Sequence, residues 1–538
     1  MKSPAIALLF VALATPVAHA VDIADYGACQ GNPDDSGRIQ SAIDAAWSLD
    51  QEVVFSCLAP IHSTVYVQPP ASESITLRGL QPGDGIRLAG QVAGTVPSFG
   101  PTAMIVQHCD GCVIRDLTFD GAPTPESPSF DANLLAILGS HSATVTQNTF
   151  VRGSRLAALL ARNNEHNTYS GNVIDGTTSN TRGMWLGNPC EANPQPGSDC
   201  YQNPVAGQEL YPTITRNIVS NTGHTGIATN TIGALITRNV STDTGGAGLV
   251  LATNDVIHTQ DALVDENLFV RNGFHCVQSD GGGARTERVV VTNNVCSEPG
   301  EHGVQITRAD WWYVAHNRIT NANGKGIVVK GANNITLELN DITDTKPEGC
   351  RTQTTGIYVL GGAELDERSN CILILNNTVS NSTDSGIVVL TENGAPEQSA
   401  DTIHVLLNTS TGNAMYGLRL SESGACRTTN VAVGQNTFTP NGLGTISDGT
   451  NSTGCGASTC AVSCPAQSST CDPSGSGLCR DVLPPSCGTQ STGLQFCLDH
   501  AALLQCPLGE TIEVDSCTCE AIKGGSFCPS VSRTLICR

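Results

Sequence analysis

Between about residues 140 and 440 the chain repeats one short phrase, and this repetition constrains its fold more than any other feature. The phrase has an Asn shortly after an apolar pair, several polar residues, and then Gly followed by apolar–x–apolar. Clear copies are ITRNVSTDTGGAGLVLATN (236–254), VTNNVCSEPGEHGVQITR (291–308) and ILNNTVSNSTDSGIVVLT (374–391). The Asn falls at 148, 172, 217, 239, 267, 294, 317, 340, 377, 408 and 436, mostly 22 to 28 residues apart. Segments this short cannot bury an apolar face alone, so successive copies must stack on one another.

The stretch Gly–apolar–x–apolar has the period of two that indicates a strand whose alternate side chains point inward. The repeat is too short for a propeller blade, and its segments are too short for helical repeats. We therefore predict an all-β fold, a right-handed parallel β-helix of about ten to twelve coils. The recurring Asn would form a ladder at a tight turn. The expected inward residues are Ile227, Leu249, Leu251, Cys276, Val304, Ile306, Ile327, Val329, Ile357 and Val359.

An amphipathic helix is expected ahead of the first coils. The segment DDSGRIQSAIDAAWS (34–48) places Ile39, Ile43 and Trp47 on one face, with Asp35 or Ser36 as the N-cap. Such a helix would cover the open first coil of a solenoid. The segment VDIADYGACQGNPDDSGRIQSAIDAA (21–46) resembles the opening of the pectate-lyase superfamily of β-helix proteins, and the resemblance extends to about residue 445. That superfamily includes lyases, epimerases, hydrolases and adhesins, so the resemblance implies the fold and leaves the function open.

Three segments are expected along the chain. Residues 1–20 combine Lys2, an apolar run and Ala18-His19-Ala20, which is typical of a secretory signal peptide. Residues 21–447 form the β-helix, and 448–538 form a cysteine-rich disulfide module that could bind a surface or cap the last coil. We expect a secreted or periplasmic protein with no membrane span. The expected disulfides are Cys29–Cys57, Cys190–Cys200, Cys276–Cys296 and Cys350–Cys371, and for Cys109 and Cys112 a structural role is favoured over a redox or zinc motif.

The formal net charge of −22 argues against nucleic acid as a partner. Seven Lys and Arg residues nevertheless fall within 271–330, more than twice the density of the whole chain. A basic cluster in an acidic protein indicates an anionic ligand. We expect a monomer whose partner is an acidic polysaccharide.

Stacking of the coils brings equivalent positions of successive phrases together. The column just before the Gly reads His224-Thr225, Ala247, Phe274-His275, Glu301-His302 and Lys325. The column just after the strand reads Asn230, Thr253-Asn254-Asp255, Ser279-Asp280, Thr307-Arg308 and Lys330. Arg308 and Lys330 are thus expected one coil apart in the same column. The competing interpretation is that these outward polar side chains are only solvated.

Glycoside hydrolysis requires two carboxyl groups with separate roles. Glu301-His302-Gly303 and Val328-Val329-Lys330 are similar to motifs of the polygalacturonases. Where those hydrolases carry aspartates, this chain has Gly246-Ala247 and Phe274-His275. Hydrolysis is therefore disfavoured, although Asp255 and Asp280 could form a differently placed pair.

Proton abstraction from a uronic acid requires a cation that neutralises the sugar carboxylate, together with a base. The segment EHGVQITRADWWYVAHNRI (301–319) resembles a stretch of the mannuronan C5-epimerases, and the resemblance places His302 and Arg308 at matching positions. One coil earlier those enzymes carry Asp-Pro-His with the catalytic His, whereas this chain has Gln278-Ser279-Asp280. The identity of the base therefore stays open among His302, His275 and Lys330.

We expect a polysaccharide lyase that acts on a uronate polymer by β-elimination. The alternatives are a C5-epimerase, a hydrolase that uses Asp255 and Asp280, and a glycan-binding adhesin. Catalytic roles are expected for Lys330, Arg308, His302 and His275, and substrate contacts for Asp280, Asp255, Lys325, Trp311 and Trp312. The two tryptophans could stack on sugars or pack against the next coil. No cofactor is required, although Asp255 and Asp280 could hold Ca²⁺ or simply pair with Arg308 and Lys330.

Overall fold

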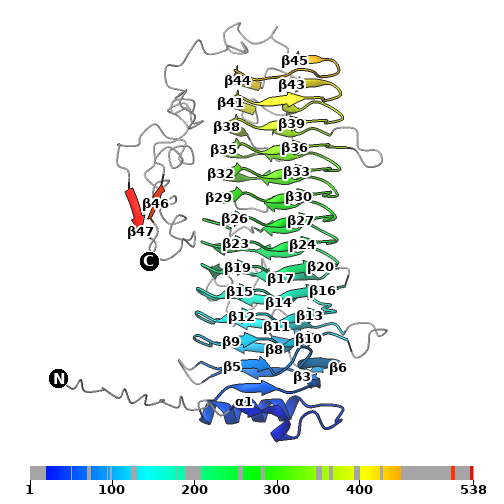
Figure 1. Cartoon of the computed structure of the whole chain (residues 1–538), viewed down its shortest axis with the longest axis vertical. Coiled ribbons are helices and arrows are strands. Elements are labelled where there is room, and N and C mark those ends of the chain that lie inside the picture. The colour runs from blue at the N-terminus through cyan, green and yellow to red at the C-terminus, as the bar shows by residue number, and fades with distance from the viewer. Residues whose placement is uncertain are drawn as a thin grey trace, which may run out of the picture.

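The computed structural model shows a tall, narrow solenoid in which one strand layer lies on the next (Figure 1). It describes residues 20–449, except for 50, 70–73, 94, 97–99, 123–129, 179, 188–207, 253–258, 280–284, 347–353, 363–367, 393–399 and 424–427, and also residues 511–514 and 533–536. The predicted signal peptide lies outside these residues apart from Ala20. The predicted cysteine-rich module is described only in its first residues and in β46 (Thr511–Val514) and β47 (Arg533–Ile536), which pair antiparallel.

Three parallel sheets run the length of the solenoid. Sheet A contains, in spatial order, β1 (Val21–Asp22), β2 (Val53–Phe55), β5 (Thr76–Gly79), β9 (Val113–Arg115), β12 (Thr144–Thr146), β15 (Thr168–Ser170), β19 (Thr213–Thr215), β23 (Leu235–Thr237), β26 (Leu263–Asp265), β29 (Thr286–Thr292), β32 (Ala309–Ala315), β35 (Asn333–Glu338), β38 (Ser369–Leu375), β41 (Ala400–Leu406) and β44 (Thr428–Gly434). Sheet B contains β3 (Leu58–Ser63), β6 (Gly85–Ala93), β10 (Thr118–Asp120), β13 (Thr149–Val151), β16 (Val173–Asp175), β20 (Ile218–Ser220), β24 (Val240–Thr242), β27 (Leu268–Val270), β30 (Val295–Ser297), β33 (Arg318–Thr320), β36 (Asp341–Thr343), β39 (Thr378–Ser380) and β42 (Thr409–Thr411). Sheet C contains β4 (Val65–Val67), β8 (Gly100–Gln107), β11 (Asn133–Leu138), β14 (Ala157–Arg162), β17 (Arg182–Leu186), β21 (Ile227–Thr229), β25 (Leu249–Leu251), β28 (Val277–Ser279), β31 (Val304–Thr307), β34 (Ile327–Lys330), β37 (Ile357–Gly362), β40 (Ile387–Glu392), β43 (Tyr416–Ser423) and β45 (Gly444–Gly449), with β7 (Thr95–Val96) paired to β8.

Each coil contributes one strand to each sheet, and each strand pairs in parallel with its counterpart in the next coil. Thus β26, β27 and β28 pair with β29, β30 and β31. The predicted parallel β-helix is confirmed. Sheet B alone has 13 strands, somewhat more than the predicted number of coils. A short extra parallel pair, β18 (Glu209–Leu210) with β22 (Thr231–Ile232), lies where the chain passes from sheet C to sheet A.

The interior is apolar because the alternate residues of each short strand point inward and stack on the same residues of neighbouring coils. Leu249, Val277, Val304 and Ile327 form one such row and are buried. Cys276 is buried in the core as predicted, but one place earlier than expected: Val277 pairs with Leu249 and Val304, and Cys276 takes the place that Gly occupies in other coils.

The predicted Asn ladder is present at the corner between sheets A and B, which we call the A–B corner. From Asn148 to Asn436, each side-chain amide donates to the Asn side chain of the next coil at 2.9–3.1 Å. Each amide also donates to a backbone carbonyl; Asn267, for example, reaches Ile236 O at 2.9 Å. The ladder therefore satisfies polar backbone groups that the tight corner would otherwise bury without partners.

Helix α1 (Ser36–Leu49) covers the first coil at the base of the solenoid (Figure 1). Ile39 and Ile43 are buried in the core, and Trp47 packs against it, as predicted. Asp35 is the N-cap, since its carbonyl accepts from the amides of Arg38 and Ile39. A single-turn 3₁₀ helix, η1 (Ile23–Tyr26), precedes α1.

The predicted disulfides Cys29–Cys57 and Cys276–Cys296 are present, and Cys109 is joined to Cys112. Cys371 is also disulfide-bonded, whereas Cys350, Cys190 and Cys200 lie outside the described residues. No helix in the described part of the chain is long and apolar enough to cross a membrane.

Candidate functional site

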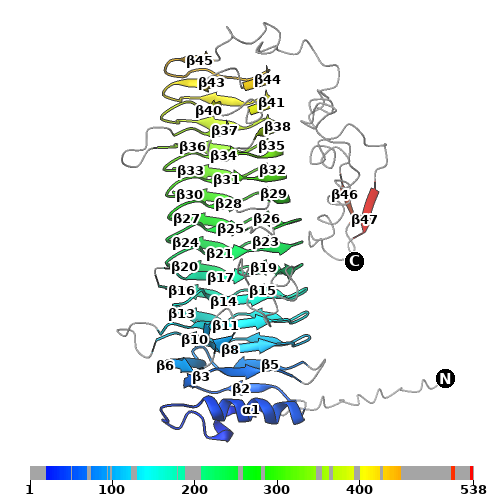
Figure 2. The ribbon, with the colours of Figure 1, turned by 180° about the vertical axis from the view of Figure 1, so that it is seen from behind.

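The residues just before β28, β31 and β34 lie at the corner between sheets B and C, which we call the B–C corner. Figure 2, the view from behind, shows these three strands lying one above another. Backbone hydrogen bonds hold the corner in register: Gly248 N donates to His275 O at 2.8 Å, and Gly303 N donates to Lys325 O at 3.0 Å. The predicted column Ala247, His275, His302 and Lys325 is therefore formed as expected.

His275 and His302 lie face to face on successive coils, with ring centroids 5.0 Å apart and planes inclined by 27°. Glu301 Oε2 lies 3.6 Å from His275 Nε2. His275 is buried, whereas Glu301 and His302 are partly exposed. Gly324 permits this packing, because a Cβ atom there would lie 2.6 Å from His302 Nδ1.

The backbone determines which nitrogen of each ring carries the proton. His302 N donates to His275 Nδ1 at 3.3 Å, and Lys325 N donates to His302 Nδ1 at 3.1 Å. Both Nδ1 atoms are acceptors, so the neutral rings carry their protons on Nε2. Burial lowers the pKa of His302 well below its usual range, and repulsion by His275, Lys325 and Lys330 lowers it further. His302 is therefore neutral near pH 7 and acts there as an Nε2–H donor.

Lysine charge borders the two imidazoles. Lys325 Nζ lies 4.8 Å from the centroid of the Tyr358 ring, in a cation–π arrangement. Tyr358 belongs to a buried apolar cluster on sheet C, together with Val328, Leu360 and Val388. The polar B–C corner thus adjoins a buried apolar cluster in the following coils.

Arg308 and Lys330 lie at the other end of these strands. The prediction that they share a column was wrong by one residue, since Lys330 pairs with Thr307. Arg308 follows the strand in a left-handed conformation (φ 50°), and its amide donates to Lys330 O at 3.1 Å. The two cations are therefore neighbours in adjacent coils, displaced by one position along the chain.

Trp311 and Trp312 lie in β32, which follows the turn at Arg308 and belongs to sheet A. Trp312 is only 1% exposed, and its Nε1 donates to Thr286 Oγ1 at 3.1 Å inside the solenoid. The prediction that Trp312 stacks on a sugar is therefore wrong, and the alternative prediction, that it packs within the solenoid, is correct. Trp311 is partly exposed and adopts a left-handed conformation (φ 61°) within β32, where neither Trp311 nor Arg288 of β29 is paired but the register is kept.

A sequence model of the right-handed β-helix region matches residues 102–296 and 256–438. The chain belongs to the right-handed β-helix family. No curated protein matches its sequence.

Among solved structures, the fold of this β-helix protein is similar to the A-module of the mannuronan C-5 epimerase AlgE4 of Azotobacter vinelandii, with 18% identity, a TM-score of 0.40, and 80% of this chain and 97% of that chain covered. It is also similar to a tailspike protein of the E. coli bacteriophage HK620, with 12% identity, a TM-score of 0.48, and coverage of 77% and 80%. The surface adhesin PfbA of Streptococcus pneumoniae gives 14% identity, a TM-score of 0.43, and coverage of 76% and 93%. At these identities the likenesses concern the fold alone.

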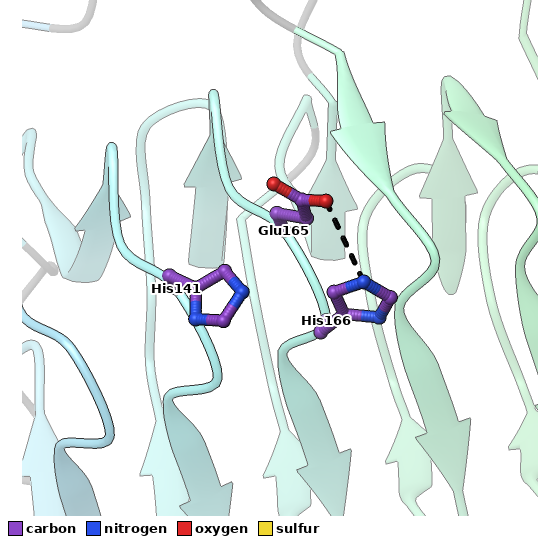
Figure 3. A group of neighbouring side chains, drawn as sticks. All are labelled: His141, Glu165 and His166. Atoms are coloured by element: carbon purple, nitrogen blue, oxygen red, sulfur yellow. Dashed lines mark ion pairs between the residues drawn. The ribbon is translucent and has the colours of Figure 1, made fainter.

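Asp255 and Asp280 lie outside the described residues, so the predicted Ca²⁺ site and the predicted charge ladder with Arg308 and Lys330 remain predictions. The β-helix does reveal a group that the sequence analysis missed. His141, Glu165 and His166 lie together at the corner between sheets C and A, which we call the C–A corner (Figure 3). The segments Ser140-His141-Ser142 and Asn164-Glu165-His166 occupy equivalent places in successive phrases. From this spacing the group could have been found in the sequence.

A buried carboxyl group lies beneath the same corner. Tyr169 Oη donates to Glu209 Oε1 at 2.6 Å, and Asn164 Nδ2 donates to Glu209 Oε2 at 2.8 Å. Burial raises the pKa of Glu209 to about 7, although both hydrogen bonds act in the opposite direction. This group lies inside the solenoid, so its role is structural.

Proposed function

We propose that this β-helix protein is an exported lyase that binds an acidic, uronate-containing polysaccharide along the outer face of sheet C and cleaves it by β-elimination. The disulfides and the signal-like segment at residues 1–20 support export, since disulfides form in oxidising compartments. An acidic polymer is favoured because Arg308, Lys325 and Lys330 gather on one surface of a protein whose formal net charge is −22.

One observation carries the proposal: the stacked His275–His302 pair, with both Nδ1 atoms held by backbone amides, lies beside lysine charge. This arrangement presents the neutral Nε2–H donor of His302 next to lysine cations. Such a combination can bind an anionic sugar and donate hydrogen bonds to its oxygen atoms without requiring a change of charge at the imidazoles.

In the proposed reaction Arg308 pairs with the uronate carboxylate, which makes the proton on C5 more acidic. Lys330 first releases its ammonium proton to solvent, and the resulting amine then removes the C5 proton. The C4–O bond then breaks as a C4=C5 double bond forms, and the departing oxygen takes a proton from solvent water. The base is assigned to Lys330 because the Nδ1 lone pairs of His275 and His302 already accept backbone hydrogen bonds. His302 Nε2–H assists as a hydrogen-bond donor to the substrate.

The test uses the full chain and a panel of uronate polymers, with the ultraviolet absorbance of unsaturated ends as the readout, in the presence of Ca²⁺ and of a chelator. We expect the wild-type protein to produce unsaturated ends from at least one polymer. Lys330→Ala should slow this at least about 100-fold, the usual contribution of a general base. Lys346→Ala is the matched control, since Lys346 is an exposed lysine beside Asp344.

The outcomes separate the alternatives. Exchange of the C5 proton with solvent deuterium, without unsaturated ends, would assign the protein as an epimerase. New reducing ends without absorbance would indicate a hydrolase, and binding without either product would indicate an adhesin. Loss of activity in the chelator alone would implicate a Ca²⁺ site such as the one predicted at Asp255 and Asp280.

A further inference from the structure

We propose that His141, Glu165 and His166, at the C–A corner, form a binding site for a divalent transition ion of the Zn²⁺ class. One ligand atom from each residue lies within 4.8 Å of those of the other two. His166 Nε2 and Glu165 Oε1 are 3.5 Å apart. Ligand atoms about 2.1 Å from a tetrahedral ion lie about 3.4 Å from each other, so this pair already has the required separation.

A carboxylate orients the first histidine. His141 Nδ1 lies 3.1 Å from Asp110 Oδ1 and 3.0 Å from Ser142 Oγ. The carboxylate of Asp110 can only accept, so Nδ1 carries the proton and the lone pair is on Nε2. A carboxylate that accepts from the second nitrogen of a histidine is the usual outer partner of a metal ligand, because it fixes the ring and increases its basicity.

The second histidine is oriented by packing. The His166 ring stacks on Tyr211, with centroids 5.1 Å apart and planes inclined by 15°. His141 and His166 meet edge to face, at 79°. In Figure 3 one ring nitrogen of His141 faces the gap in front of Glu165 and His166. Edge-to-face rings can direct lone pairs from different sides toward one point, as a tetrahedral ion requires.

The other His–Glu–His group of the described residues fits a metal less well. In His275, Glu301 and His302 the ligand atoms also lie within 4.8 Å of one another. The two rings, however, are stacked at 27°, so the lone pairs of equivalent nitrogens run nearly side by side. Both Nδ1 atoms also accept backbone amides. The C–A corner is therefore the better metal site, and the B–C corner remains assigned to the substrate.

The donor set selects the type of ion. Two imidazoles and one carboxylate suit Zn²⁺ and similar ions, whereas Ca²⁺ and Mg²⁺ prefer oxygen ligands. The side chains of His141, Glu165 and His166 are about half exposed, at 52%, 47% and 51%. A bound ion would therefore keep water in its fourth position, and the site is open enough to exchange its ion with solvent.

The experiment measures Zn²⁺ binding to the full chain by calorimetry, and the visible spectrum after Co²⁺ replaces Zn²⁺. Variants are His141→Ala, Glu165→Gln and His166→Asn, since Asn tolerates the left-handed conformation of residue 166 (φ 57°). The matched control is His316→Asn, because His316 is also exposed and has φ 55°.

We expect each of the three site variants to weaken the strongest Zn²⁺ binding at least about tenfold, as loss of a ligand or of its outer partner does. Asp110→Asn should have a smaller effect in the same direction. His316→Asn should leave the affinity unchanged. Wild-type affinity in a folded His141→Ala/His166→Asn double variant would overturn the proposal, as would a Co²⁺ spectrum of thiolate type. Because all these residues are exposed, circular dichroism should show folded variants.

Discussion

Two corners of the same solenoid follow opposite rules. At the A–B corner one residue type, Asn, is present in every coil from Asn148 to Asn436. At the B–C corner the equivalent residues change from coil to coil, as Ala247, His275, His302 and Lys325 show. The first corner is buried and must satisfy the same backbone groups each time, whereas at the second backbone hydrogen bonds join every coil and side chains add to them only in some coils, as at His275 and His302. A residue that recurs in every coil thus stabilises the stack of coils, and a position whose residue varies from coil to coil can carry functional side chains.

The largest effect is expected at the A–B corner. Asn267→Ala removes four hydrogen bonds, to Ile236 O, to Asn294 Oδ1, and from the backbone and side-chain amides of Asn239. Unpaired buried groups cost about 1–3 kcal/mol each, so the free energy of unfolding should fall by about 4 kcal/mol. Denaturant unfolding measures this.

The end of the ladder provides the control for that prediction. Asn436 is partly buried and makes three such hydrogen bonds, two accepted from Asn408 and one donated to Val405 O, so Asn436→Ala should cost less than Asn267→Ala. Equal losses at both positions would contradict the idea that the interior of the ladder carries the stability.

Glu209 extends the comparison to the C–A corner. Its pKa is raised to about 7 from 4.5, so the protonated form favours folding below pH 4.5, and this contribution is lost as the pH rises through 7. Between pH 5 and 8 the loss amounts to about 2–3 kcal/mol. Unfolding of Glu209→Gln over this range should show a correspondingly flatter profile. Glu298→Gln, at an exposed carboxyl, serves as the control, and a wild-type slope in Glu209→Gln would refute the assignment.

A substitution at the B–C corner should separate activity from stability. In His302→Asn, the Asn oxygen can replace Nδ1 as acceptor for Lys325 N, but the Nε2–H donor is lost. Turnover on the cleaved polymer should fall about tenfold or more, while the free energy of unfolding changes by less than about 1 kcal/mol. Rates at saturating polymer and denaturant unfolding test the two parts. A large loss of stability with full turnover would contradict this prediction, because His302 would then stabilise the fold and have no part in the reaction.

The smallest effect concerns Lys325. Lys325→Met keeps the aliphatic stem and removes the charge over Tyr358. The free energy of unfolding should fall by about 0.5–1 kcal/mol. The salt dependence of binding to the acidic polymer should also decrease. Lys346→Met is the control, and it should change neither quantity. Unaltered salt dependence in Lys325→Met would remove Lys325 from the substrate surface.

Several site features could be derived from the repeat, and others could not. The stacking of His275 on His302 follows directly from the Gly-centred frame. The offset between Arg308 and Lys330 does not, because it depends on strand pairing at Thr307. The roles of the tryptophans depend on the left-handed conformation of Trp311 (φ 61°) inside β32, after which Trp312 is buried in the core. The group at His141 was missed because it lies outside that frame.

By itself the sequence determined the parallel β-helix, the position of every rung in the Asn ladder, the capping helix and the column of histidines. These follow from periodicity, since a repeat that cannot bury its apolar face alone has to stack in register. Only the tertiary structure decided the proton positions on His275 and His302, the burial of Trp312, and the meeting of His141 with Glu165 and His166. Those features depend on contacts of a few ångströms between coils, which the spacing of residues along a chain does not specify.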